Sequence, residues 1–518
     1  MKRELNFKVK DKSIFSKRKK YNFEAKKKLA QLIDCLTKVY LKNFPDVDEK
    51  VLKVIIFKST QIISDALFYY KFINVKKNKK NFFVFKSSGD LEKCSIDGTL
   101  LYNIDYLSKN YNEHFDFDFI NIYDKGLDKI NLGLSKIFFL NIIKLFNFKK
   151  KIIIDIINIK LYLKFLIKGY QPSFLNPDKL NKEFFLNFDK KLRTNFFRYG
   201  KEIYNSNRND YKNINLKEIY ILLCNLPINI VENFSLFQEN IKKIKNKNYK
   251  KIILARISSK NDNCNFWLYN HLLSENTSLE VYQHGAGYLF IDYDPLSDFE
   301  ISFSNKFYSW IKNKNSNCLQ YPVMTQFKKS NKKKYDILLI NSDWASFYKI
   351  NSTPFSLLRD KNRLEQINFI KKINYTDNYI IKDPPILYEN YGDLYKKKEV
   401  SDNKITNINL KFIIPQSKIC VCSYIGSTFF ELMSSNIPFI SFTKLSENVF
   451  SSDAEKYMKK LKEFGVLFYS GNSAANFLNK NHLEFYQLWE DKNFSQFREE
   501  FRKKFCNNIN NWQDLFIK

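Results

Sequence analysis

The stretch that most constrains the fold of this chain combines a strand, a glycine turn and the start of a helix. Residues 419–422 are an apolar run that predicts a short buried strand, and Gly426 interrupts the run. Residues 429–433 then predict the first turns of a helix, and residues 437–442 predict a second strand. A strand, a helix and another strand in this order indicate a βαβ unit, and hence an α/β fold.

The turn at Gly426 also predicts a binding site. The N-terminus of a helix presents free backbone N–H groups and the positive end of the helix dipole, which together suit a phosphate group. Glu431, one turn into the helix, is placed to reach a ribose hydroxyl. An alternative stays open, because Thr428 and Glu431 have the spacing of a capping box, in which both side chains serve only the amides of their own helix.

A second candidate site lies upstream, at Gln283, His284 and Gly285. Residues 279–283 predict a strand that carries His284 at its tip, and Gly285 and Gly287 would let the backbone approach a ligand closely. An imidazole is well suited to act as general base for an acceptor hydroxyl. The alternative is a turn histidine that hydrogen-bonds within its own loop. Two strand-end sites in two α/β halves predict a ligand held between the halves.

Length and charge narrow the class of protein. A chain of 518 residues is too long for one core, so we expect about two to three domains. The formal net charge of +32 would in general favour nucleic acid or an anionic membrane. The excess is mostly lysine, however, whereas specific nucleic-acid readers rely on arginine and a recognisable module. We therefore expect no nucleic-acid partner, and anionic ligands such as nucleotides and lipid head groups instead.

The sequence offers little that would bind a metal. Its eight cysteines include no C-x-x-C pair, which argues against a zinc site and favours reduced thiols in a cytoplasmic protein. Asp-x-Asp triplets occur at Asp116 and Asp118 and again at Asp292 and Asp294, but such triplets often arise by chance. We expect no bound metal and no cofactor.

Membrane association has one candidate segment. Residues 1–20 are basic but lack the apolar region of a signal peptide, and no stretch of about 18 uncharged apolar residues predicts a transmembrane helix. Within residues 152–167 a helix is predicted, and Lys160, Lys164 and Lys168 recur every four residues along one face. This segment is either a basic amphipathic helix on an anionic membrane or a core helix whose lysines face water.

The predicted elements divide the chain into four parts. Residues 1–200 are a helix-rich region that joins the first Rossmann-like domain, residues 201–327 complete that acceptor-side domain, residues 335–484 form a nucleotide-binding Rossmann-like domain, and residues 485–518 form a closing helix. Predicted strands of the two domains are residues 251–255, 279–283, 301–303, 335–340, 378–381, 419–422, 437–442 and 466–469, and residues 265–273 predict a helix.

Short motifs follow one another along residues 215–505. They are Gln283-His-Gly285, Asp298-Phe-Glu-Ile-Ser302 with Phe307-x-Ser-Trp310, Lys382 with Asn390-Tyr-Gly392, Ser427-Thr-Phe-Phe-Glu431 with Asn436-Ile-Pro438, and Gly465-Val-Leu467 with Ala474-Ala475 ahead of Trp489. Their order resembles a family of transferases associated with bacterial surface-polysaccharide gene clusters. It is more distantly similar to CDP-glycerol glycerophosphotransferases, capsule synthesis transferases and other GT-B enzymes.

The resemblance implies a GT-B-like architecture, in which two Rossmann-like domains face each other across a cleft. It implies a glycosyltransferase that moves a sugar from a nucleotide-activated donor to a surface-polysaccharide or glycolipid acceptor. The donor phosphates would lie at Gly426, Ser427 and Thr428. Glu431 would hold the ribose, and Lys382 would help to neutralise the leaving group without a metal ion.

On the acceptor side, the resemblance implies that His284 acts as general base, with Gln283 and Gly285 binding substrate beside it. The sequence departs from the family pattern in two places. Ala286 stands where a second glycine is usual, and Lys382 stands where arginine is expected. A lysine keeps the positive charge but lacks the bidentate fork with which a guanidinium group binds phosphate.

Two other functions stay open on the sequence. A sugar-nucleotide epimerase uses the same two-domain frame, but it needs several acidic and histidine groups around one sugar, and such a set is not evident. A non-catalytic scaffold of polysaccharide assembly at the membrane surface would rest on residues 131–170 and the basic N-terminus. An epimerase would convert its sugar nucleotide without any acceptor.

Overall fold

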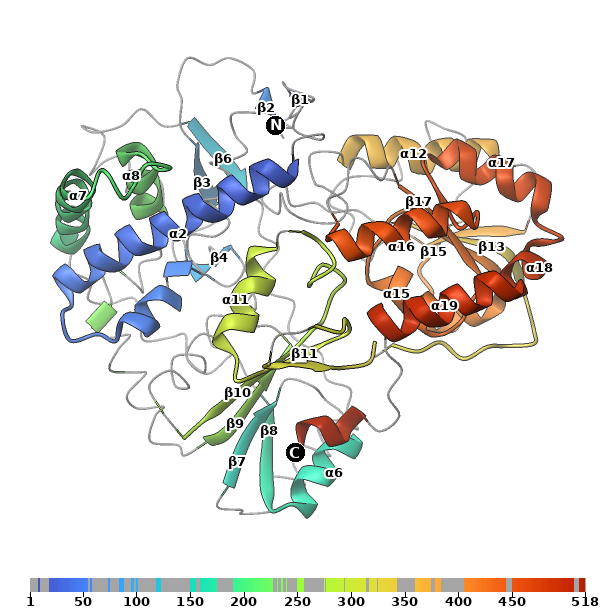
Figure 1. Cartoon of the computed structure of the whole chain (residues 1–518), viewed down its shortest axis with the longest axis horizontal. Helices are drawn as coiled ribbons and strands as arrows, with labels where there is room; N and C mark the ends of the chain where they lie inside the picture. Colours follow the sequence, from blue (N-terminus) through green and yellow to red (C-terminus); the bar gives the residue numbers. More distant parts are fainter. Residues whose placement is uncertain are drawn as a thin grey trace.

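The computed structural model describes residues 8–9, 18–54, 56–57, 73–74, 83–87, 95–96, 99–100, 118–122, 150–154, 159–174, 190–226, 231, 234–235, 239, 249–255, 274, 276–292, 294–313, 316–323, 325–341, 359–373, 378–382, 405–443, 450–506 and 512–517. Within these ranges the chain forms two α/β units, each built on a parallel sheet (Figure 1).

The first sheet has six parallel strands among the described residues, in the order β8-β7-β9-β10-β11-β12. The strands are β7 (Lys150–Ile154), β8 (Tyr170–Phe174), β9 (Tyr249–Leu254), β10 (Ser278–Tyr282), β11 (Lys306–Ser309) and β12 (Cys318–Gln320). Strand order reverses between β7 and β9, as it does in doubly wound folds, and ligands of such folds bind at the carboxyl ends of the strands.

Helices cover both faces of this sheet because successive strand residues point to opposite sides. Ile153 and Ile252 point to one face and share a buried cluster with residues of α2, α7, α8 and α11. Ile152 and Ile253 point to the other face, where they share a buried cluster with α6. The helices are α2 (Arg18–Asn43), α6 (Ile159–Ile167), α7 (Lys190–Ser206), α8 (Leu216–Asn225) and α11 (Pro295–Phe303).

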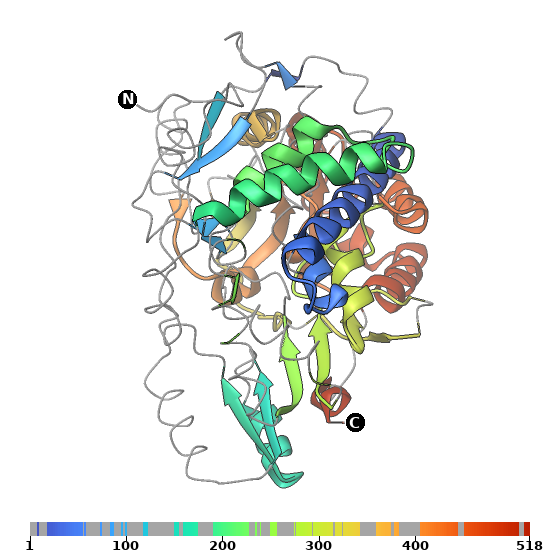
Figure 2. The ribbon, with the colours of Figure 1, turned by 90° about the vertical axis from the view of Figure 1, so that its left-hand side faces the viewer.

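Short strands accompany the N-terminal helices. They are β1 (Lys8–Val9), β2 (Ile73–Asn74), β3 (Phe83–Ser87), β4 (Ser95–Ile96), β5 (Thr99–Leu100) and β6 (Asp118–Ile122), which pair as β1-β2, β3-β6 and β4-β5. Figure 2 shows α2 crossing α7 and α8 above the first sheet. The long helix α2 agrees with the expectation that the N-terminal region is rich in helix.

The second sheet also has six parallel strands among the described residues, in the order β15-β14-β13-β16-β17-β18. They are β13 (Tyr335–Ile340), β14 (Tyr379–Lys382), β15 (Ile405–Thr406), β16 (Ser417–Cys422), β17 (Phe439–Phe442) and β18 (Leu467–Phe468). Numbered along this half of the chain, the order is third, second, first, fourth, fifth, sixth, which is the Rossmann order with its reversal between β13 and β16.

Helices pack on both faces of the second sheet, which explains why its central strands read as continuous apolar runs. They are α12 (Arg359–Lys372), α14 (Leu410–Ile413) with the short 3-10 helix η5 (Ile414–Gln416), α15 (Ser427–Ser434), α16 (Ser452–Glu463), α17 (Gly471–Asn481), α18 (Phe485–Glu490) and α19 (Lys492–Phe505). The two parallel sheets confirm the expected α/β fold with two Rossmann-like domains, as a GT-B-like architecture requires.

The two halves share an apolar contact. The ring of Phe290, from the segment after β10, packs edge-on against Phe430 and Phe505 of the second half, with ring centroids 4.8 and 5.4 Å apart. Two backbone hydrogen bonds accompany this packing, from Ser451 N to the Phe290 carbonyl at 2.9 Å and from Lys312 N to the Lys504 carbonyl at 3.1 Å. The loops at the carboxyl ends of the first sheet are thus packed directly on the second half.

The C-terminal residues return to the first sheet. The 3-10 helix η7 (Trp512–Phe516) lies beside α6 in Figure 1. Phe516 is fully buried, and the ammonium group of Lys251 donates a hydrogen bond to its carbonyl oxygen at 2.7 Å. Lys251 also pairs with the buried carboxylate of Glu280 at 2.8 Å, and the hydroxyl of Tyr308 donates to the same carboxylate. Each end of the chain therefore helps to cover the first sheet.

Two local predictions are wrong. Residues 301–303 belong to α11 rather than to a strand, and the strand of this region comes later, at β11. The helix predicted within residues 152–167 begins only at Ile159, because Ile152 to Ile154 belong to β7 and their branched side chains suit a sheet. The helix predicted at residues 265–273 lies outside the described residues. None of the helices within the described ranges is long and apolar enough to cross a bilayer.

Candidate functional site

The candidate site lies where the carboxyl ends of β10 and β16 come together. The loop after β10 carries His284 and Gly285, and the turn after β16 leads into α15 at Ser427. A Cβ atom built on Gly285 would lie 4.0 Å from Oγ of Ser427, and this is its nearest neighbour outside the adjoining residues. The two sites predicted separately from the sequence therefore lie close together, one from each sheet.

The imidazole of His284 is exposed and is held through Nδ1. Nδ1 lies 3.0 Å from the carbonyl oxygen of Ala255, the residue after β9, and 3.0 Å from the hydroxyl of Tyr288. A carbonyl oxygen can only accept a hydrogen bond, so Nδ1 carries the proton in the neutral ring and the lone pair lies on Nε2. The ring of Tyr288 stands edge-on to the imidazole, with centroids 5.4 Å apart. This arrangement suits a base that acts through Nε2.

Gln283 shapes the loop that holds the histidine. Its side chain is buried, and its Oε1 accepts hydrogen bonds from Trp310 N at 2.9 Å and from the hydroxyl of Ser309 at 3.0 Å. Its Nε2 donates to the carbonyl of Gly285 at 2.7 Å. The amide of Gln283 is thus engaged by the end of β11 and by its own loop, so its contribution to a substrate site is to position His284 and Gly285.

The segment that follows contains a strained residue. Leu289 has φ of 58°, in the left-handed region that branched and bulky residues seldom adopt. It lies between Tyr288, which contacts the histidine, and Phe290, which packs on the second half. Such strain persists only where the surroundings impose it, and it is common at binding sites. The sequence offered no sign of this feature.

The helix α15 starts at Gly426 without a side-chain cap. Gly426 is its N-cap residue, and no side chain of the described residues caps it. The capping-box alternative is therefore wrong, because Thr428 lies in the second helical position and is hydrogen-bonded to the hydroxyl of Tyr424 instead. The first amides of α15 thus lack the side-chain oxygen that usually serves a helix start. A bound anion would supply what the cap does not.

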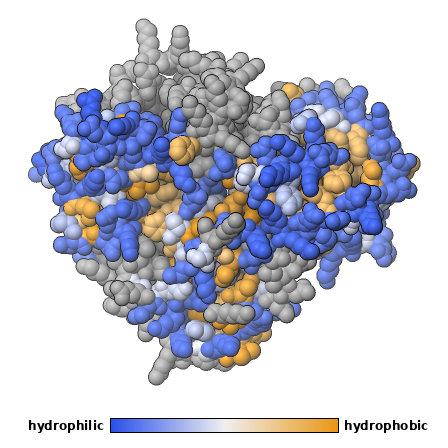
Figure 3. Space-filling view, viewed as in Figure 1, coloured by the Kyte–Doolittle hydropathy of each residue, from blue (hydrophilic) through white to orange (hydrophobic). Residues whose placement is uncertain are grey.

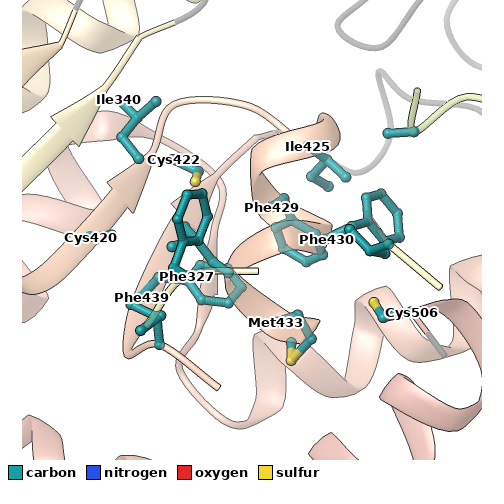
Figure 4. Close-up of a cluster of buried hydrophobic side chains, with 14 of the residues drawn as sticks. Phe327, Ile340, Cys420, Cys422, Ile425, Phe429, Phe430, Met433, Phe439 and Cys506 are labelled. Atoms are coloured by element: carbon teal, nitrogen blue, oxygen red, sulfur yellow. The ribbon is translucent and has the colours of Figure 1, made fainter. Parts of the chain in front are cut away.

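Position 426 requires glycine because a side chain would not fit there, and not because of the backbone conformation. Its φ of −139° is extended and open to any residue. A Cβ atom at this position would lie 2.0 Å from Cε2 of Tyr424, whose ring crosses beneath the turn. Below the turn, Phe429, Phe430 and Met433 anchor α15 in a cluster of buried side chains (Figure 4). The helix start is therefore rigidly seated, with its amides at the edge of the sheet.

Glu431 lies in the first turn and a half of α15 and faces the segment that joins the two halves. Burial raises the pKa of its carboxyl group, and a hydrogen bond with the Thr325 side chain opposes this shift. In the same connecting segment, the backbone amide of Phe327 donates a hydrogen bond to the hydroxyl of Ser435 at 2.8 Å. A ribose hydroxyl that reached Glu431 would thus meet a partly buried carboxylate already held by the connection between the halves.

Lys382 lies at the same edge of the second sheet but apart from Gly426. In the register of the sheet, Lys382 is level with Ile340 of β13, and Ile340 is level with Cys422 of β16. Two strand spacings, about 10 Å, therefore separate the backbones of β14 and β16. The ammonium group of Lys382 leans the other way, 3.5 Å from the carbonyl of Thr406 in β15. The structure does not bring it to the helix start.

A residue that the sequence analysis missed lies between them. Asn341 follows β13 directly, is buried, and donates from its backbone amide to the Lys382 carbonyl at 3.0 Å. Ser423, after β16, donates through both its amide and its hydroxyl to the Ile340 carbonyl at 3.1 Å. The reversal of strand order lies between these two strands, where doubly wound folds bind ligands. A polar residue directly after an apolar strand was the signal that could have revealed Asn341.

The acidic triplets do not assemble a metal site within the described ranges. Oδ2 of Asp294 accepts a hydrogen bond from the hydroxyl of Ser297 at 2.6 Å, at the start of α11. No group of three or more histidine, cysteine or acidic side chains suited to a metal occurs among the residues that the structure describes. Asp116 lies outside those residues, and Asp118 forms the start of β6.

Comparisons with known proteins complete this picture. No curated protein matches the sequence. Among solved structures, S. aureus MnaA with UDP has 12% identity and a TM-score of 0.35, covering 68% of this chain and 95% of that one. The rhamnosyltransferase SpnG with spinosyn aglycone has 9% identity and a TM-score of 0.31, covering 71% and 96%. A UDP-N-acetylglucosamine 2-epimerase has 8% identity and a TM-score of 0.35, covering 84% and 100%.

Structural similarity at such low TM-scores does not indicate which reaction this protein catalyses. The family comparison is of a different kind, since residues 108–518 match the description LIC12162 family transferase. That match includes both sheets, the loop after β10 and the turn before α15. The chain therefore belongs to the LIC12162 family of transferases.

Proposed function

We propose that this transferase is a glycosyltransferase that moves a sugar from a nucleotide-activated donor to a saccharide or lipid-linked acceptor. The observation that carries the proposal is the approach of Gly285 to Ser427, which sets an exposed histidine beside a helix start that lacks a side-chain cap. A base and an anion-binding helix end are the two parts that glycosyl transfer from a nucleoside phosphate needs.

In the proposed donor site, the phosphates lie against the amides of Gly426, Ser427 and Thr428. Charge builds up on the leaving phosphate as the glycosidic bond breaks, and helix amides held in place before the reaction stabilise that charge without reorganisation. Glu431 accepts hydrogen bonds from the ribose. Lys382, at the same edge of the sheet, adds positive potential at longer range. These groups meet the phosphate charge, so the proposed reaction does not depend on a metal ion and should proceed in EDTA.

In the proposed acceptor site, Nε2 of His284 takes the proton from the acceptor hydroxyl. The acceptor oxygen then forms its bond to the anomeric carbon while the bond from that carbon to the phosphate oxygen breaks. Gln283 and Gly285 hold the loop in position for this transfer. The acceptor proposed is a surface polysaccharide or its glycolipid precursor, reached from the cytoplasmic face of the membrane by a peripheral protein.

Thermal unfolding in the presence of CMP, CDP, UDP, GDP or TDP tests the donor site directly. A ligand at a hundred times its dissociation constant stabilises a protein by about 2.7 kcal/mol, which a melting curve resolves easily. We expect one nucleotide to raise the melting temperature, and Glu431→Gln to reduce that shift. Glu463→Gln, which removes an exposed carboxylate of the same domain, is the matched control and should behave like the wild type.

Analysis of the products formed from the identified donor then shows which reaction the protein catalyses. Transfer requires an acceptor and releases the nucleotide, whereas an epimerase would convert the sugar nucleotide alone. Nucleotide binding with epimerised donor and no transfer would overturn the proposal. No shift with any nucleotide, in protein shown to be folded, would overturn it as well and would favour a non-catalytic scaffold.

A further inference from the structure

The crossover helix α6 lies at the lower end of the molecule in both ribbon views (Figures 1 and 2). It connects β7 to β8 and packs on the outer part of the first sheet. Its inner side is fully buried, through Leu161, Tyr162 and Phe165. A helix in this position would ordinarily show water a polar outer side, because only its inner side is needed for packing.

The outer side of α6 is instead partly apolar. Ile167 is 82% exposed and Leu163 is 46% exposed, and the two residues are one turn apart on the same side of the helix. Lys160 and Lys168 are exposed beside them, and Lys164 forms an ion pair with Asp514 of η7. Figure 3 shows hydrophobic surface at the lower end of the molecule, where α6 lies. Two adjoining apolar side chains on a surface rich in lysine suggest a specific partner.

The start of β7 extends the basic part of this surface. Lys150 is exposed, lies on the α6 side of β7 together with Ile152, and is level with Tyr170 of β8, only two residues beyond Lys168. The ammonium group of Lys150 lies over the Tyr170 ring, 5.5 Å from its centroid. We use the name α6 surface for Lys150, Lys160, Leu163, Ile167 and Lys168. Among the described residues, Asp514 is the acidic side chain that forms an ion pair with α6, and it pairs with Lys164. The lysines of the α6 surface therefore keep their positive charge uncompensated within the described residues, and the surface is strongly positive.

We propose that the α6 surface docks on a lipid bilayer that contains anionic lipids. Such a bilayer offers both things that this surface lacks, namely phosphate groups for the lysines and an acyl boundary for Leu163 and Ile167. A second copy of the chain would bring like charges together. A nucleic acid would satisfy the lysines but leave the apolar pair in water. A helix of nine residues is about 14 Å long and lies in the plane of the interface rather than across it.

Vesicle flotation with the full-length protein tests this proposal, and its outcome does not depend on the transferase reaction. We expect the protein to float with vesicles of phosphatidylcholine and phosphatidylglycerol, and to remain behind with phosphatidylcholine alone. Lys160→Glu with Lys168→Glu should weaken partition by more than about tenfold, because each lysine near an anionic surface contributes to binding. About 1 M salt, which shortens the Debye length to about 3 Å, should have a similar effect.

The apolar contribution needs its own variant. Leu163→Gln with Ile167→Gln leaves the charge unchanged, and both side chains are exposed, so folding should be retained. We expect this variant to bind anionic vesicles at least about fivefold more weakly than the wild type. The matched control is Lys480→Glu with Leu483→Gln in the second half, which alters an exposed lysine and a leucine that is 83% exposed.

Each other outcome overturns the proposal. A control that weakens binding as much as the α6 variants would show that overall charge, rather than this surface, attracts the vesicles. Undiminished binding by Leu163→Gln with Ile167→Gln would show that the partner is a polyanion only, as for RNA. Absence of binding by the wild type would refute a bilayer as the partner of α6.

Discussion

The loop after β10 and the turn after β16 occupy equivalent places in their sheets, yet they are built in different ways. Hydrogen bonds organise the first, where Gln283 engages Ser309, Trp310 and Gly285, and a backbone carbonyl holds His284. Apolar packing organises the second, where the ring of Tyr424 fills the space beneath Gly426.

This difference in construction indicates that the two regions have different functions. Hydrogen bonds fix the tautomer and direction of an imidazole, which is what a proton-transfer group requires. Close packing fixes a helix start and exposes its amides, which is what a phosphate site requires. We therefore expect substitutions in the first region to change the rate of transfer, and those in the second to change nucleotide affinity.

The largest effect is expected for His284→Ala. Loss of a general base typically lowers kcat by about 10²- to 10⁴-fold. Nucleotide affinity, measured by calorimetry, should stay within about twofold, since the phosphates are assigned to α15. His482→Ala, which removes a histidine at the end of α17, is the matched control and should leave kcat unchanged. Loss of nucleotide binding in His284→Ala would instead assign this histidine to the donor site and break the comparison.

Gly426→Ala should come next, through steric conflict. The new methyl group would lie 2.0 Å from Cε2 of Tyr424, so the ring or the turn must move. We expect a loss of about 1–3 kcal/mol in the free energy of unfolding, measured with denaturant, together with weaker nucleotide binding. Gly285→Ala should change stability by less than about 0.5 kcal/mol, since its nearest contact lies at 4.0 Å.

A double-mutant cycle checks the cause assigned to the Gly426 effect. In the Tyr424→Ala background the ring is gone, so Gly426→Ala should cost less than it does alone. An equal cost in both backgrounds would contradict the steric explanation.

Glu431→Gln should separate stability from binding. Loss of one charged hydrogen bond to ribose should lower nucleotide affinity by about 10- to 100-fold. Burial raises the pKa of Glu431, so the native state binds its proton more readily than the unfolded state. Stability therefore falls as pH rises from the ordinary glutamate pKa of 4.5 through the folded value, and the amide variant lacks this loss.

Melting temperatures measured across this pH range test the argument. As pH rises, the melting temperature of Glu431→Gln should increase relative to that of the wild type. At acidic pH the two melting temperatures should become equal. A variant that is less stable at neutral pH would show that the carboxylate is stabilised in its charged form and would contradict the role of burial.

The smallest effects are expected when two tyrosine hydroxyls are removed. Tyr288→Phe removes the contact with Nδ1 of His284 at 3.0 Å, and Tyr424→Phe removes the contact with Thr428. A single neutral hydrogen bond contributes about 0.5–1.5 kcal/mol, so each effect should be about two- to tenfold. Tyr288→Phe should lower kcat at unchanged affinity, and Tyr424→Phe should weaken nucleotide binding. If each variant changed kcat and nucleotide affinity to the same extent, the two regions would not differ in function as proposed.

Local sequence patterns predicted much of the second half. The apolar runs at residues 335–340 and 419–422 appear as β13 and β16, because strands buried on both faces must be apolar throughout. The same reasoning failed at residues 301–303, whose apolar residues serve one side of α11. A segment of three residues is too short to distinguish the period of a helix from that of a strand.

The sequence by itself determined the central strands of both sheets, and where a histidine and a glycine turn end two of those strands. These features depend on residues close together in the chain. Only the tertiary structure decided that Gly285 meets Ser427, that the Ala255 carbonyl orients His284, and that Gly426 lies over Tyr424. Such contacts depend on strand order and on the packing of the two halves, which no local pattern records. The placement of Lys382 beside Thr406, away from the helix start, was decided in the same way.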